Sequence, residues 1–168
     1  MRRRSFLAAT VTGAAVATSG CLEGEVVLDV NESTTVRAHR GWVQEIDDVE
    51  GAAEVSYTVR SSDVRFEVFY FTDPEEFQAY QEFTLGGNED LEERPEGHTP
   101  LRAVAVNNEE RGAFEAAVPG DGGRYSLDIE DTHYFVVDHS NYGEVDVAST
   151  ADDLSVVIRL EVVKDRLW

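Results

Sequence analysis

The chain has 168 residues, with 34 acidic against 14 basic side chains and a formal net charge of −20, which argues against a nucleic-acid partner because such a surface repels phosphates. Hydrophobic residues make up 42% of the sequence, so the chain can bury a core and is not a disordered stalk. A single cysteine excludes a fold held together by internal disulfides.

The first 21 residues are predicted to be an export signal rather than part of the fold. Three arginines precede an apolar run over Phe6–Val16, which is shorter than the about 20 residues that a membrane-spanning helix needs. Their order resembles the twin-arginine (Tat) export consensus, and the resemblance implies export of an already folded domain. The positions that match are Arg3, Arg4, Phe6 and Leu7. A general secretory signal is the alternative.

A lipidation site is predicted where this signal ends. The run Thr18–Cys21 resembles a lipobox, in which small residues precede a cysteine that is lipidated and becomes the mature N-terminus. Thr18 departs from the pattern, because an aliphatic residue is usual there. A diacyl anchor on Cys21 would supply the two chains that durable membrane attachment needs. Simple cleavage that leaves Cys21 as a free thiol is the alternative.

These signals divide the chain into three parts. We expect a signal peptide over residues 1–20, a lipidated tether over 21–24 and one domain over 25–168, held on the outer face of the cell membrane. Loss of the signal arginines takes the formal charge from −20 to −23. Acidic excess with Lys164 as the only lysine resembles the proteins of extreme halophiles, notably haloarchaea. The resemblance implies a salt-adapted surface whose self-repulsion is screened at molar salt.

Alternation of apolar and polar residues dominates the rest of the chain. It is strictest over residues 55–60, 64–71, 124–129 and 156–163, and is typical of strands with one buried face. Further strand candidates are Val26–Val30, Thr34–His39, Leu101–Val106, Ala113–Val118, Tyr134–Asp138 and Val145–Ala148. Turn signals at 61–63 and 119–123 predict hairpins. The sequence therefore predicts an all-β fold, an antiparallel β-sandwich of about 8–10 strands.

One short helix interrupts the strands. Asp73 is a predicted N-cap, and Pro74 occupies the first helical position. Phe77 and Tyr80 share one face of this helix, which we expect to cover an open end of the sandwich. The polar segment 86–100 follows as the best candidate for a mobile loop.

No spacing in the sequence points to a metal, a cofactor or a catalytic centre. The histidines do not form a metal-binding motif, and no calcium-binding loop occurs. They are His39, His98, His133 and His139. Asp138, His139 and Ser140 are the residue types of a catalytic triad, but adjacent residues on a strand point to opposite faces. We therefore assign no catalytic or metal-binding residue and interpret Asp138 and Ser140 as turn formers.

The run His133–Ser140 resembles the late strand of Golgi-dynamics (GOLD) domains, in which a tyrosine-rich strand ends in an aspartate-asparagine turn. His139 stands where that family has the asparagine. GOLD domains are β-sandwiches on membrane-anchored cargo receptors. The resemblance covers eight residues, so it implies a sandwich fold and carries no site or function.

We expect a non-catalytic extracytoplasmic lipoprotein that serves as a membrane-anchored binding or interaction module in a halophile. Its partners would be the membrane, through the lipid anchor, and a protein or ligand that the sequence does not identify. One alternative is a secreted hydrolase that uses carboxylates from distant strands, and a deep pocket with two carboxylates of raised pKa would favour it. A flat aromatic patch would favour binding instead. A solute-binding component of a transporter is a further alternative.

Overall fold

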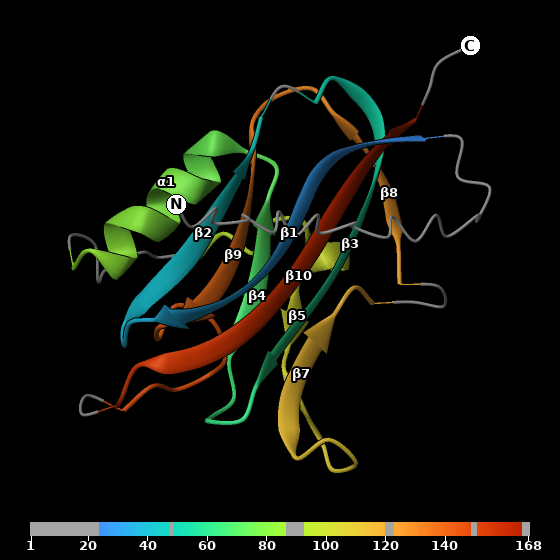
Figure 1. The fold of residues 1–168 in the computed structure, drawn as a ribbon. Coiled ribbons are helices and arrows are strands. Elements are labelled where there is room, and N and C mark those ends of the chain that lie inside the picture. Colours follow the sequence, from blue (N-terminus) through green and yellow to red (C-terminus); the bar gives the residue numbers. More distant parts are fainter. Residues whose placement is uncertain (1–23, 48, 87–92, 120–122, 149–150, 166–168) are drawn as a thin grey trace, which may run out of the picture.

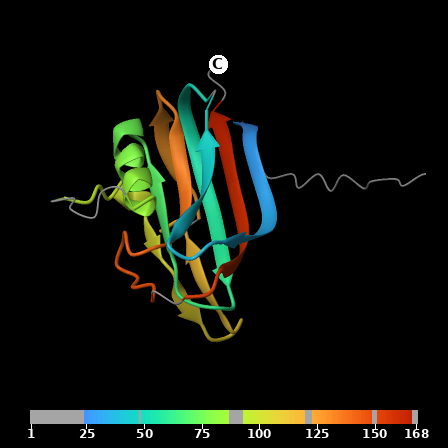
Figure 2. The same ribbon diagram turned by 90° about the vertical axis from the view of Figure 1, so that its left-hand side faces the viewer.

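The computed structural model describes residues 24–47, 49–86, 93–119, 123–148 and 151–165. In these ranges ten strands form two antiparallel sheets that pack face to face, with one α-helix on the outside (Figures 1 and 2). The predicted β-sandwich of about 8–10 strands with one short helix is confirmed. Within the described ranges, no helix has the length and the apolar character needed to cross a bilayer.

The larger sheet has six strands in the order β1-β10-β3-β7-β6, with β8 also paired to β3. Its strands are β1 (Gly24–Val36), β3 (Gly51–Ser61), β6 (Val106–Asn108), β7 (Ala113–Ala117), β8 (Tyr125–Ile129) and β10 (Leu154–Asp165). The two strand candidates before residue 40 are therefore one strand, β1. β8 pairs with Gly51–Val55 and β7 with Thr58–Ser61, so they follow one another along the same side of β3. The hairpin predicted at 119–123 is wrong, because β7 and β8 do not pair with each other.

The smaller sheet has four strands in the order β2-β9-β4-β5. They are β2 (Arg40–Ile46), β4 (Glu67–Phe71), β5 (Ala103–Val104) and β9 (His133–His139). The hairpin predicted at 61–63 is also wrong, because β3 and β4 belong to different sheets and the turn crosses between layers. β2 lies outside the predicted strands, and the candidate Val145–Ala148 is not a strand.

The hydrophobic core lies between the two sheets. Alternate residues of the central strands face inward, as the sequence pattern predicts, and are almost completely buried. The inward residues of these strands include Val55, Val59, Val68, Tyr70, Phe135, Val137, Ile158 and Leu160. Two tilted rings, Tyr57 and Phe135, join the sheets with centroids 5.0 Å apart. Burial of this apolar surface is the main stabilising term of the fold.

Helix α1 (Pro74–Thr84) adds a third layer over the outer face of the smaller sheet (Figure 2). Its N-cap is Asp73, which accepts a hydrogen bond from the Glu75 amide at 2.8 Å, as predicted. Phe77 and Tyr80 pack on the sheet rather than over an open end of the sandwich. All five residues of β4 are therefore buried, although alternation predicts only one buried face.

Candidate functional site

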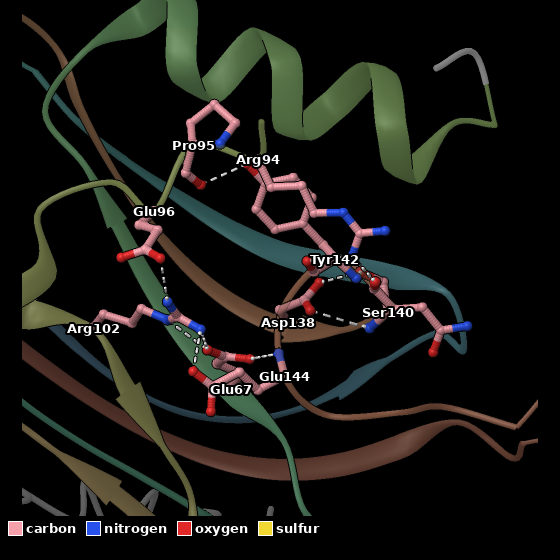
Figure 3. Close-up of polar contacts among 10 residues, drawn as sticks. Glu67, Arg94, Pro95, Glu96, Arg102, Asp138, Ser140, Tyr142 and Glu144 are labelled. Atoms are coloured by element: carbon pink, nitrogen blue, oxygen red, sulfur yellow. Dashed lines mark hydrogen bonds and ion pairs between the residues drawn. The ribbon is translucent and has the colours of Figure 1, made fainter. Parts of the chain in front are cut away.

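Buried charged and polar side chains gather on the outer face of the smaller sheet, beside α1 (Figure 3). Glu67 on β4 and Asp138 on β9 are cross-strand partners there, and both are almost completely buried. Gly41 on β2 pairs with Asp138 from the other side, so three strands meet at this level. We call the group the covered cluster, and it comprises the buried residues Glu67, Tyr80, Asp138 and Ser140 together with the half-buried Arg102 and the exposed Glu144 at its border.

The carboxylate of Asp138 accepts three hydrogen bonds from within the fold. They come from the Tyr80 hydroxyl at 2.7 Å, the Ser140 hydroxyl at 2.8 Å and the Ser140 amide at 3.3 Å. Burial, with a smaller contribution from the charge of Glu67, outweighs these donors and raises the pKa of Asp138 to about 6. Gly41 is required here, because a Cβ at that position would clash with the Tyr80 hydroxyl.

Glu67 is held by a guanidinium and by a backbone amide. One carboxylate oxygen pairs with Arg102 at 2.6 Å, and the other accepts from the Glu144 amide at 2.8 Å. Arg102 also reaches the carboxylate of Glu144 at 3.2 Å and lies over the Phe69 ring. Gly143 makes this approach possible, because a Cβ there would clash with the Glu67 carboxylate. Both oxygens of Glu67 are therefore used inside the fold.

A second arginine, Arg94, connects its own loop to the loop 141–144 and to α1. Arg94 donates to the carbonyl oxygens of Asn141 at 2.7 Å and Tyr142 at 2.8 Å, and it lies over the Phe83 ring at 4.7 Å. The Tyr142 hydroxyl donates to the carbonyl of Pro95 at 2.7 Å (Figure 3). A hollow of about 190 Å³ remains between these loops and Arg102. Asp138 does not line this hollow.

The covered cluster contains the two neighbouring carboxylates that the hydrolase alternative requires, and one has a raised pKa. Every carboxylate oxygen of the pair nevertheless has a donor within the fold. Tyr80 also lies over Asp138 from the side of the helix. The geometry is that of a clamp joining α1 and the loops 93–96 and 141–144 to the sheet.

The histidines are distributed over the fold. His139 faces the core side of β9, where its Nε2 lies 3.0 Å from the Asp152 carbonyl oxygen. Asp138 and Ser140 bond to each other on the opposite face without it, so these residues form a turn motif and no relay. The Nδ1 of His133 lies 3.1 Å from the Tyr70 hydroxyl, and burial lowers the pKa of His133. Among the described residues, no three His, Cys, Asp or Glu side chains are placed to hold a metal ion.

The outer face of the larger sheet has a different character. Two shallow hollows of about 620 and 440 Å³ follow one another along β10, the first beside Arg159 and Glu161 and the second beside Ser155 and Val157. No helix of the described residues covers this face (Figure 2). We call it the open face, and it consists of the outward residues of β1, β10, β3 and β7.

The residues predicted for export and lipidation lie outside the described ranges. They are Arg3, Arg4, Phe6, Leu7 and Cys21. Sequence reasoning also missed Glu67 and Arg102, although a lone glutamate within the aromatic run 66–71 is a signal for a buried partner. No protein-family model matches this chain, and no curated protein matches it either.

Proposed function

We propose that the protein is a non-catalytic binding module of a halophile, exported by the Tat pathway and held on the outer face of the cell membrane by a lipid on Cys21. The open face carries this proposal, because it is a broad polar surface that nothing in the described fold covers. The covered cluster, by contrast, has its carboxylates engaged with donors from the fold. A binding surface needs accessible groups, and the open face supplies them.

The position of the anchor suits this surface. Three residues after Cys21 the chain enters β1 at Gly24, and three residues span at most about 11 Å. The end of the sandwich where Gly24 pairs with Asp165 would therefore stand close to the bilayer. β1 then runs about 40 Å to Val36, which pairs with Leu154 at the other end. The open face lies along this length and would face sideways, clear of the membrane.

Photo-crosslinking in intact cells tests the binding function. A photoreactive residue at Ser33, which is exposed on the open face, is compared with one at Gln78, on the exposed side of α1. We expect a specific adduct from Ser33 and none from Gln78. Adducts of equal yield from both positions, or none from either, would contradict the proposal.

Export and anchoring are tested separately in the full-length chain. Cys21→Ser should move the protein from the membrane fraction to the medium. Undiminished membrane retention of this variant would contradict the proposed lipid anchor. Arg3→Lys combined with Arg4→Lys should keep the protein in the cytoplasm, because the paired arginines are the proposed Tat signal. Normal surface display of that variant would mean another export route.

The hydrolase alternative depends on Asp138 and Glu67, the paired carboxylates of the covered cluster. Substrate would have to displace Tyr80 from Asp138, which costs the buried hydrogen bond between them. A glycoside or ester hydrolysis that is lost in both Asp138→Asn and Glu67→Gln, while the fold is kept, would establish the alternative.

A further inference from the structure

The open face is hollow because its outward side chains are short. On β1 and β3 they are mostly hydroxyl and amide residues, and β10 contributes the longer ones at its centre. The outward residues that line the two hollows include Asn31, Ser33, Thr35, Ser56, Thr58 and Ser155. On β1, β3 and β10 no aromatic side chain points outward along these described positions. The floor of the first hollow is therefore mostly polar, whereas that of the second, beside the exposed Val157, is more apolar.

Arg159 stands at the centre of this floor. In the register of the sheet it lies between Asn31 on β1 and Thr58 on β3. Its side chain is exposed and makes no ion pair or side-chain hydrogen bond with any other residue that the structure describes. Its five N–H donors are therefore available to a ligand.

The two arginines at the borders of the open face behave differently. Arg60 pairs with Glu115 at 2.5 Å, whereas Arg124 bridges Glu54 at 3.2 Å and Glu161 at 2.9 Å. These ion pairs occupy the guanidinium groups at the rims of the hollows. Of the charged residues that line the first hollow, Asp29 and Arg159 are the ones left without an ion pair in the described chain. Their opposite charges leave the centre of the floor neutral overall.

This set of groups selects the chemistry of the ligand. A guanidinium donates hydrogen bonds, a carboxylate accepts them, and hydroxyl and amide side chains can do both. Sugar hydroxyls also donate and accept, so they complement such a floor. An amphipathic helix would need an apolar groove, which the first hollow with Asp29 and Arg159 does not offer. An extended peptide would pair with a strand edge rather than lie on a sheet face. A polyanion would be repelled by this acidic protein, because Arg159 is the one arginine at the centre of the floor and the one there without an ion pair in the described chain.

The shape of the floor indicates a chain rather than a single ring. The two hollows follow β10 from Glu161 to Ser155, a distance of about 20 Å along the strand. Salt adaptation points to an uncharged ligand. At molar salt the Debye length is about 3 Å, so attraction between charges at a distance is lost, whereas hydrogen bonds in direct contact persist.

We propose that the open face binds an uncharged carbohydrate chain, with Arg159, Asn31 and Thr58 as its central contacts. The inference rests on the proposed function as a binding module and names the ligand class of that module. Arg159 would donate to vicinal hydroxyls of one sugar, and Asp29 would accept from a neighbouring one.

The test uses full-length protein purified from membranes and an array of uncharged and acidic oligosaccharides, probed in molar salt. The best uncharged oligosaccharide is then titrated against three variants, each checked for its fold by circular dichroism. Arg159→Ala removes the central donors, and Thr58→Trp fills the floor. Arg37→Ala is the matched control, because Arg37 is exposed, lies in the turn after β1 and has no ion pair in the described chain.

We expect the wild type and Arg37→Ala to bind equally, and Arg159→Ala to lose about tenfold or more in affinity, as for a removed charge-assisted hydrogen bond. Thr58→Trp should abolish binding. Absence of any bound uncharged oligosaccharide, or equal binding by all variants, would overturn the proposal. So would binding confined to acidic oligosaccharides and lost at molar salt. A protein crosslinked from Ser33, without glycan binding, would refute the carbohydrate as the ligand and leave the proposed binding module intact.

Discussion

The outer face of the smaller sheet is closed by α1, whereas the outer face of the larger sheet meets solvent across β1, β10 and β3 (Figures 1 and 2). On the closed face, large aromatic rings and two carboxylates are buried together. On the open face, short polar side chains surround Arg159, which has no ion pair with any described residue. Similar alternating strands thus yield one outer surface that is buried by a helix and another that no described element covers. The predictions below separate these two roles.

Salt concentration should have the largest effect, and it acts on the exposed acidic surface. Dialysis from molar salt to about 0.1 M lengthens the Debye length to about 10 Å and restores repulsion among the carboxylates. We expect the domain to unfold, as monitored by near-ultraviolet circular dichroism. A melting temperature that is independent of salt would contradict the halophilic interpretation.

Truncation of an aromatic ring should distinguish the two faces next. Phe71 is fully buried beneath α1, so Phe71→Ala should lower the unfolding free energy by about 3–5 kcal/mol. Val157 is 43% exposed on the open face, and Val157→Ala should change the unfolding free energy by about 0.5 kcal/mol or less. Denaturant titration at molar salt measures both. Equal losses would show that the open face also carries stability.

The ion pairs of the two faces offer a matched comparison of arginines. Arg102→Ala leaves the buried Glu67 carboxylate without its cation and should cost about 3 kcal/mol. Arg60→Ala breaks a pair whose side chains are 33% and 23% exposed, so the expected cost is about 1 kcal/mol or less. The same denaturant titration applies. A larger loss of unfolding free energy from Arg60→Ala than from Arg102→Ala would contradict the assignment of the stabilising role to the covered cluster.

The pH dependence of stability should report the burial of Asp138. Its folded-state pKa of about 6 lies above the ordinary value of 3.8, so the native state holds this proton more tightly than the unfolded chain. The resulting stability is fully present below pH of about 4 and is lost as the pH rises through 6. The difference in unfolding free energy between Asp138→Asn and the wild type should therefore shift in favour of the variant by about 2–3 kcal/mol as the pH rises from 4 to 7. A constant difference would mean that Asp138 is well solvated.

The extent of sequence-based prediction follows from how local each signal is. Alternation along β3, β8 and β10 depends on neighbouring residues alone, so it predicts these strands and the sandwich. A turn signal predicts a reversal but does not say which sheet receives the next strand. The reversals at 61–63 and 119–123 were therefore misread as hairpins.

The covered cluster could not be predicted, because its contacts join distant parts of the chain. Glu67 and Asp138 meet through strand register, and Gly41 matters because of the Tyr80 hydroxyl that lies against it. For the open face, alternation predicts only that one side of the strands is not buried. Its distinguishing property is that Arg159 has no ion pair among the described residues, and this requires the positions of its neighbours in space.

The central claim is that the open face binds a ligand, whereas the covered cluster and the rings beneath α1 stabilise the fold. Its most direct test is the yield of the Ser33 photo-crosslink in Arg159→Ala protein, measured in intact cells beside the unfolding free energy of the same variant. We predict that the yield falls about tenfold while the unfolding free energy changes by about 0.5 kcal/mol or less. An unchanged yield would contradict the account.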